Sequence, residues 1–320
     1  MFINKVKFKI NMIDLIIVII SLIWLSFASL NDLKTREVPD WISYSLIITA
    51  LAFYLIKSIV IKDFSFILQS LFALLTLFLL GNLMYYARQW GGGDVKLLAA
   101  LGALFPIYPK ELLNYFNPNL DLPFLVILIL NIIIFGALYS LIYSIYLIIK
   151  NKIKISFKIN KIYFIASVLI LLLTFLFENL IIKLAFLILA LLILIYPYVK
   201  EFVSLIENKL MIKRISINKL TEGDWVIENI YYKRKLLYNK NNPGITNQEM
   251  ILLKKFKIKN VLIKEGLPFI PSFLIALVVS LIFGNLLKIW NGNIYIIQVI
   301  TVITGDYIWL DILSMPENKW

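Results

Sequence analysis

Long apolar segments separated by short polar loops dominate the pattern of this chain. Uncharged or nearly uncharged runs occupy residues 15–30, 41–56, 64–87, 123–149, 162–177, 184–199 and 267–287, with a shorter run at 97–108. A helix that crosses a bilayer needs about 20 residues, so several runs are long enough, and those of about 16 residues require flanking residues or tilt. The pattern predicts about six to eight transmembrane helices, with eight as the best count.

One interruption affects this number. Glu178 and Asn179 break the apolar stretch between 162 and 199. They mark either a turn between two membrane helices or a polar kink within one of them.

The composition changes between residues 200 and 266, where charged and polar residues become frequent. Turn-forming residues at 222–225 and 241–244 separate short segments, and the alternation at 256–264 has the two-residue period of a half-buried strand. The fold class that we predict is an all-α polytopic membrane protein with a small α+β cytoplasmic domain. We divide the chain into a catalytic membrane core at 1–107, further transmembrane helices at 108–199, the soluble domain at 200–266, a final transmembrane helix at 267–287, and a tail of unassigned role at 288–320.

The composition supports a multi-pass protein of the cell membrane. The 320 residues are 61% hydrophobic, against roughly 45–50% in soluble domains. The net charge of +13 comes from loops between the apolar runs, so we attribute it to orientation in the bilayer and predict no nucleic-acid partner. If the loops with Asp32 and Asp94 face the cytoplasm and all eight runs cross, 23 of the 32 basic residues lie on that side.

The chain contains no Cys and no His. Disulfides and ordinary zinc sites are therefore excluded, as are Ser-His, Cys-His and zinc-dependent proteolytic sites. If this protein hydrolyses peptides, carboxylates are the remaining catalysts, and we expect no metal and no other cofactor.

Two carboxylates stand at the edges of apolar segments. Asp32 directly follows the first run, and Asp94 follows a glycine triplet and opens an apolar run. An ionisable side chain at a membrane boundary is a functional candidate by default. Two neighbouring carboxyls share a proton, so that one can accept a proton from water while the other polarises a carbonyl. The position of Asp94 before a helix, near Lys96, favours its ionised form.

The neighbours of these aspartates have both structural and functional interpretations. Glycines allow a backbone or a substrate strand to approach closely, whereas Asp94 can simply cap the helix that follows. Basic residues can anchor helix ends at the headgroups or tune the carboxyl pair. Asp40 is expected to cap the second apolar segment, with contact to a basic substrate as the alternative. The supporting candidates are Gly91, Gly92, Gly93, Lys34, Arg36 and Lys96.

These segments resemble the type IV prepilin peptidase family, most closely its archaeal preflagellin and prepilin peptidase branch. Residues 32–40 and 91–102 are similar to the two catalytic segments, and Asp32 and Asp94 fall on the catalytic aspartates. Residues 266–276 are similar to the C-terminal membrane segment. The resemblance implies an aspartic endopeptidase that removes a short basic leader from pilin-like or archaeal flagellin precursors at the cytoplasmic face. A Cys-rich insertion that accompanies methylation in many bacterial members is absent, so we expect no methyltransferase activity.

Two alternatives stay open. Presenilin and signal-peptide-peptidase enzymes also use Gly-x-Gly-Asp, but their first aspartate typically lies inside a span, whereas Asp32 follows an apolar run. A membrane transport or assembly protein could use the two acids to carry protons or ions. Transporters often contain inverted repeats, and we find no internal repeat in this sequence.

Overall fold

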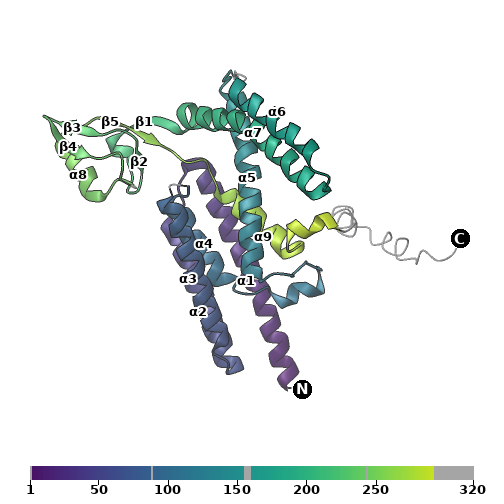
Figure 1. Cartoon of the computed structure of the whole chain (residues 1–320). Helices are drawn as coiled ribbons and strands as arrows, with labels where there is room; N and C mark the ends of the chain where they lie inside the picture. The colour runs from purple at the N-terminus through teal and green to yellow at the C-terminus, as the bar shows by residue number, and fades with distance from the viewer. Residues whose placement is uncertain (1, 88, 155–159, 243, 292–320) are drawn as a thin grey trace. The chain divides into compact units, whose positions relative to one another are not determined.

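The computed structural model describes residues 2–87, 89–154, 160–242 and 244–291. Most of the tail assigned to 288–320 therefore lies outside the described residues. The chain divides into two compact units, one formed by residues up to 140 with the described residues from 268 onward, and the other by residues 141–267. Helices predominate in both, with a small sheet region in the second (Figure 1). This confirms the predicted fold class of a mainly helical protein with a small α+β domain, whereas the cytoplasmic side of that domain stays a prediction.

The first unit is a bundle of helices. Its elements are α1 (Phe2–Thr35), α2 (Asp40–Ile61), α3 (Ser65–Tyr86), α4 (Gly92–Leu104), the first part of α5 (Phe124–Lys150) and α9 (Ile270–Ile282), with short helices η1 (Lys110–Asn114) and η5 (Leu286–Asn291). Helices α2, α3 and α4 pack against one another, and α1 packs on α2 and α9 (Figure 1).

Within the described residues, five helical segments are long and apolar enough to cross a membrane. They are Asp14–Thr35, Asp40–Ile61, Ser65–Tyr86, Phe124–Lys150 and Leu180–Met211. Two shorter apolar helical segments, Lys161–Leu176 and Ile270–Ile282, add to these. The multi-pass architecture is thus confirmed, whereas the count of eight spans stays a prediction.

Helix α4 forms the centre of the first unit. Every residue from Leu97 to Leu104 is buried, although the helix has only 13 residues. A Cβ atom at Gly102 would lie 2.6 Å from the carbonyl oxygen of Ala73 on α3, so only glycine permits this close approach. The helix ends before Phe105 because the residue preceding Pro106 avoids the helical region. Since α4 is fixed on several sides, its first turn, which contains Asp94, is fixed as well.

The second unit begins with apolar helices. The last part of α5 is followed by α6 (Lys161–Leu173), η2 (Thr174–Leu176), α7 (Leu180–Ile206) and the π-helical turn η3 (Glu207–Met211). The side chain of Asn179 accepts a hydrogen bond from the N–H of Ile181 at 2.8 Å and caps α7. Because α6 and α7 pack against each other, Glu178 and Asn179 mark a turn between two helices rather than a kink within one.

A small α+β domain follows. Its elements are β1 (Ile212–Ser216), η4 (Ile217–Lys219), β2 (Trp225–Val226), β3 (Ile230–Tyr232), β4 (Lys235–Tyr238), α8 (Asn247–Lys255) and β5 (Asn260–Lys264). One antiparallel sheet has the order β1-β5-β2, and β3 and β4 form a separate hairpin. The strand predicted from the alternation at 256–264 is confirmed from Asn260 onward, where Val261 and Ile263 point into the domain core.

Candidate active site

Asp32 lies in the last turn of α1 and is 6% exposed. The helix continues through Thr35, so Asp32 lies within it and not after it, as the apolar pattern had suggested. Arg36 then ends the helix with a left-handed φ of 61°, and its N–H donates to the Asp32 carbonyl at 3.0 Å. Arg36 also lies near enough to interact electrostatically with the Asp32 carboxyl.

The start of α9 holds the Asp32 carboxylate. The N–H of Ile270, the first residue of α9, donates to Asp32 Oδ2 at 2.9 Å. The N–H groups of a first helical turn have no partner inside their own helix, and that end of the helix dipole is positive. Pro271 at the next position favours a helix start at this point. The C-terminal helix therefore provides a preorganised anion site for a carboxylate near the beginning of the chain.

Asp94 lies in the first turn of α4 and is partly exposed. Its Oδ2 accepts a hydrogen bond from the N–H of Gly91 at 2.8 Å, so the side chain does cap the helix start. Burial raises the pKa of Asp94 to about 7, the hydrogen bond from Gly91 opposes this, and the negative charge of Asp32 adds to it. Burial thus outweighs the hydrogen bond from Gly91, and the pKa of Asp94 shifts away from the ionised form that its position before a helix and near Lys96 was expected to favour.

The three glycines before Asp94 have different roles. A Cβ at Gly93 would lie 3.1 Å from Val38 Cβ, so Gly93 allows close contact with the segment that follows Asp32. A Cβ at Gly92 would meet no atom within 4 Å. Gly91 contributes its N–H to Asp94. Close packing therefore explains only Gly93, whereas a Cβ at Gly91 would make an ordinary contact with Asp94 Oδ2 at 3.5 Å and the space at Gly92 is open.

Two of the three basic candidates, Lys96 and Lys34, make no contact with the aspartate pair among the interactions described. Lys96 Nζ pairs with Asp40 Oδ1 at 2.6 Å. Asp40 is the first residue of α2, and Pro39 before it makes no side-chain cap. The predicted cap by Asp40 was therefore wrong, because its carboxylate is directed to Lys96 instead. Lys34 is exposed in the last turn of α1.

An aromatic cluster joins the glycine loop to α9. The ring of Trp90 lies 5.7 Å from that of Phe269 and 5.8 Å from that of Phe273. On α5, a Cβ at Gly136 would lie 2.4 Å from Phe269 Cζ, so glycine makes room for this ring. Sequence reasoning missed Trp90, Phe269 and Ile270 as parts of the site. The prolines at 268 and 271 indicate a fixed turn in the sequence, but they do not indicate that this turn contacts Asp32.

The chemistry available here is acid–base chemistry by two carboxyls from separate segments. Each is fixed by a backbone N–H of a neighbouring loop or helix. In the part of the chain that the structure describes, no group of acidic side chains is arranged to hold a metal ion. Two carboxyls at close range share a proton, which supplies an acid and a base at one place.

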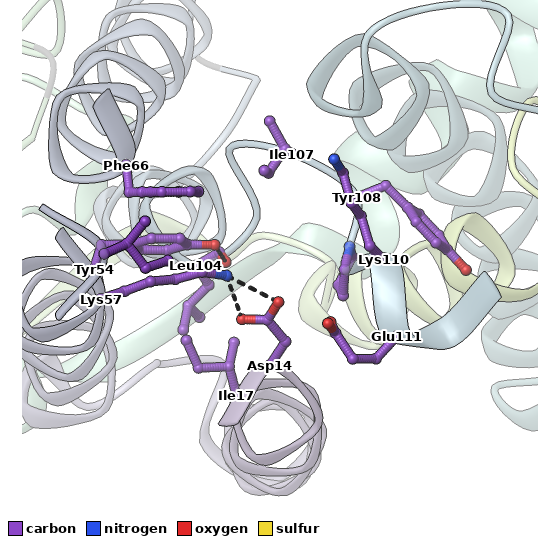
Figure 2. A pocket seen from close by; sticks show the side chains of 12 residues that line it. Asp14, Ile17, Tyr54, Lys57, Phe66, Leu104, Ile107, Tyr108, Lys110 and Glu111 are labelled. Atoms are coloured by element: carbon purple, nitrogen blue, oxygen red, sulfur yellow. Dashed lines mark hydrogen bonds and ion pairs between the residues drawn. The ribbon is translucent and has the colours of Figure 1, made fainter. Parts of the chain in front are cut away.

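A second polar cluster lies beside the middle of α1, around a cavity of about 350 Å³ (Figure 2). Lys57 Nζ pairs with both carboxylate oxygens of Asp14, at 2.7 and 2.9 Å. Figure 2 shows the Asp14 carboxylate between Lys57 and Glu111. Asp14 precedes Asp32 by about 27 Å of helix at 1.5 Å per residue. This cavity is therefore separate from the aspartate pair.

Glu111 makes the stability of this cluster dependent on pH. Burial, together with the hydrogen bond to Asp14, raises the pKa of Glu111 to about 7. The folded protein then binds this proton more tightly than the unfolded chain does, so the free energy of unfolding should fall as pH rises from about 4.5 to 7. Glu111→Gln should flatten this dependence in thermal unfolding measured in detergent, whereas Glu178→Gln, at an exposed residue, should retain it. An unchanged slope in Glu111→Gln would contradict the prediction.

Comparison with known proteins finds a family similar to the part of the chain that holds both aspartates. Residues 19–141 match the type IV leader peptidase family. A preflagellin peptidase of Methanocaldococcus jannaschii is 30% identical over 136 residues, which are 42% of this chain and 58% of that protein. A preflagellin peptidase of Methanococcus maripaludis is 33% identical over 104 residues, 32% of this chain and 45% of that protein. The prepilin peptidase EppA of Methanothermobacter thermautotrophicus is 28% identical over 147 residues, which are 44% of this chain and 38% of that protein.

The match has clear limits. It includes both aspartates and the glycine loop and confirms the resemblance predicted from them, but it ends at residue 141. The similarity predicted for residues 266–276 therefore stays a prediction. The chain spans about half the length of the curated relatives that it matches. No solved structure matches it.

Proposed function

Since residues 19–141 match the type IV leader peptidase family, we propose that this protein is a membrane-embedded aspartic endopeptidase. It removes the short basic leader of pilin-like or archaeal flagellin precursors, and its catalytic residues are Asp32 and Asp94. One observation supports the proposal most directly. Both aspartates belong to the matched range, and the negative charge of Asp32 acts on the carboxyl of Asp94 and raises its pKa.

The mechanism uses one proton shared by the two carboxyls. The ionised carboxyl accepts a proton from a water molecule, which attacks the scissile carbonyl carbon, while the protonated carboxyl polarises the carbonyl oxygen. The proton taken from water is then passed to the leaving amine as the C–N bond breaks. The raised pKa of Asp94 supports Asp94 as the protonated member at neutral pH.

The surroundings suit an extended substrate. The exposed Gly91 and Gly92 leave space beside Asp94 for a peptide backbone. Names of the relatives indicate preflagellins and prepilins as their substrates. The positive charge of the loops, counted under the assumed topology, supports a site that faces the cytoplasm.

The test is mass spectrometry of precursor N-termini. The full chain is reconstituted in liposomes with a preflagellin-like or a prepilin-like precursor. We expect a new N-terminus at the boundary between the basic leader and the apolar helix, because cleavage there removes the leader. The mass identifies the substrate and the bond together. Intact precursors of both kinds, in the presence of folded protein, would contradict the proposal and favour the transport alternative.

A further inference from the structure

The hairpin of β3 and β4, residues 230–238, carries exposed aromatic and basic side chains outside the candidate active site. Tyr231 and Leu236 lie opposite each other in the register and are 57% and 44% exposed. Their neighbours Ile230 and Leu237 point into the domain core. The two turn residues and the first residue of β4 add three exposed cations, Lys233, Arg234 and Lys235.

The backbone conformation of this turn does not explain why Lys and Arg occupy it. Lys233 and Arg234 have φ of 43° and 71°. A two-residue hairpin turn that is left-handed at both positions is most easily formed by Asn and Gly. Lys and Arg are strained there, and such outliers point to a role for the side chains themselves.

The cations of the hairpin are not balanced by nearby acids. Residues 207–265 contain 13 basic and 6 acidic residues, and no Asp or Glu occurs between 229 and 248. The six acids bond elsewhere: Glu207 to Lys264, Glu222 to Asn247, Asp224 to Thr221, Glu228 to Leu262, Glu249 to Thr246 and Glu265 to Lys213. Among the described residues, none forms an ion pair with Lys233, Arg234 or Lys235. The hairpin is therefore a locally uncompensated positive surface.

The end of α8 extends this surface. The ring of Tyr232 lies 4.6 Å from the ring of Phe256, directly after α8. In Figure 1, β3, β4 and α8 lie next to one another within the small domain. Three exposed lysines flank Phe256: Lys254, Lys255 and Lys257.

We propose that this hairpin, with the end of α8, docks on the anionic lipid surface of the membrane that the chain spans. Tyr side chains favour the headgroup level of a bilayer, and Lys and Arg are attracted to negatively charged lipid. A basic leader, the substrate class proposed above, would be repelled by the same surface. Lipid therefore fits its charge and its aromatic content.

The connections of the domain keep it within reach of that surface. Between Lys264 and Ile270 lie 5 residues, which extend over at most about 18 Å. At the other side, η3 directly follows α7. Because the domain is tethered, its effective concentration at the lipid surface is high, and a weak individual affinity is sufficient for docking.

Hydrogen exchange of the full chain in nanodiscs tests this proposal. In phosphatidylcholine with about one-third phosphatidylglycerol, amides of residues 230–238 should exchange at least about fivefold more slowly than in phosphatidylcholine alone. The triple variant Lys233→Gln/Arg234→Gln/Lys235→Gln should lose this lipid dependence. A matched triple variant, Arg214→Gln/Lys219→Gln/Lys259→Gln, removes the same charge from the domain outside the docking surface. This variant should keep the lipid dependence.

A further variant separates docking from hairpin stability. Lys233→Asn/Arg234→Gly removes two cations but fits the left-handed turn better. The amides of its hairpin should exchange more slowly in neutral nanodiscs than those of the unmodified chain. Their exchange should also change less when anionic lipid is present. Absence of any lipid effect in the unmodified chain, or an equal loss in the matched triple, would overturn the proposal. So would protection that appears with added RNA in neutral nanodiscs but not with anionic lipid.

Discussion

Asp32→Asn and Asp94→Asn should each reduce cleavage of a preflagellin-like or prepilin-like precursor by about 10³-fold. The substitution keeps the size of the side chain, and the amide oxygen can still accept the hydrogen bond from Gly91 or Ile270. It removes the carboxyl that must hold or release a proton. The measurement is the rate of precursor cleavage by each variant in liposomes.

The double variant gives a sharper result than either single variant. Because two carboxyls that share a proton act as a unit, Asp32→Asn/Asp94→Asn should be no slower than the singles. Asp63→Asn is the matched control, since Asp63 is exposed and its carboxylate bonds its neighbour Ser65, outside the candidate active site. It should cleave at close to the rate of the unmodified protein. Cleavage that survives in either single dyad variant would exclude the dyad.

The same pair predicts the direction of a pH effect. The protonated member must keep its proton, and the pKa of Asp94 is raised to about 7. Cleavage should therefore decline as pH rises above about 7, where the pair loses its shared proton. A kcat/KM profile for the unmodified protein measures this. A rate that continues to rise through pH 8 would contradict the assignment of the protonated role to Asp94.

Local features of the sequence were enough to find the two carboxylates. Asp32 and Asp94 each stand at the edge of an apolar run, and their segments are continuous in the sequence. The glycine triplet also indicated a close approach, which the structure assigns to Gly93 and Val38. These features involve residues that are close together in the sequence. The pattern and spacing of residues are therefore sufficient to predict them.

Contacts between distant segments could not be predicted in the same way. The hydrogen bond from Ile270 to Asp32 joins residues 238 positions apart, and no local periodicity specifies which helix start meets which carboxylate. Lys96 was expected to act on Asp94, two residues away, but its ammonium bonds Asp40 on α2. The pKa of Asp94 likewise depends on burial by the assembled bundle, which outweighs the local hydrogen bond from Gly91.

The pair of Asp14 and Lys57 is a further long-range contact, and breaking it should have the largest effect on stability. The two side chains are only 14% and 11% exposed. Lys57→Met leaves the Asp14 carboxylate buried without its cation and beside Glu111, so the free energy of unfolding should fall by about 3–5 kcal/mol. In detergent this corresponds to a decrease of roughly 10 °C in the thermal unfolding midpoint.

Removal of both charges distinguishes the cost of an unpaired charge from the value of the pair. Asp14→Leu/Lys57→Met replaces both partners by apolar groups and should recover most of the lost stability, because neither charge then remains buried alone. Lys288→Met is the matched control. Lys288 pairs with Asp121 at 3.2 Å, but the two side chains are 54% and 24% exposed, so its loss should cost less than about 1 kcal/mol. If the double variant were as unstable as Lys57→Met, the loss would come from packing around Lys57 and not from the uncompensated charge of Asp14.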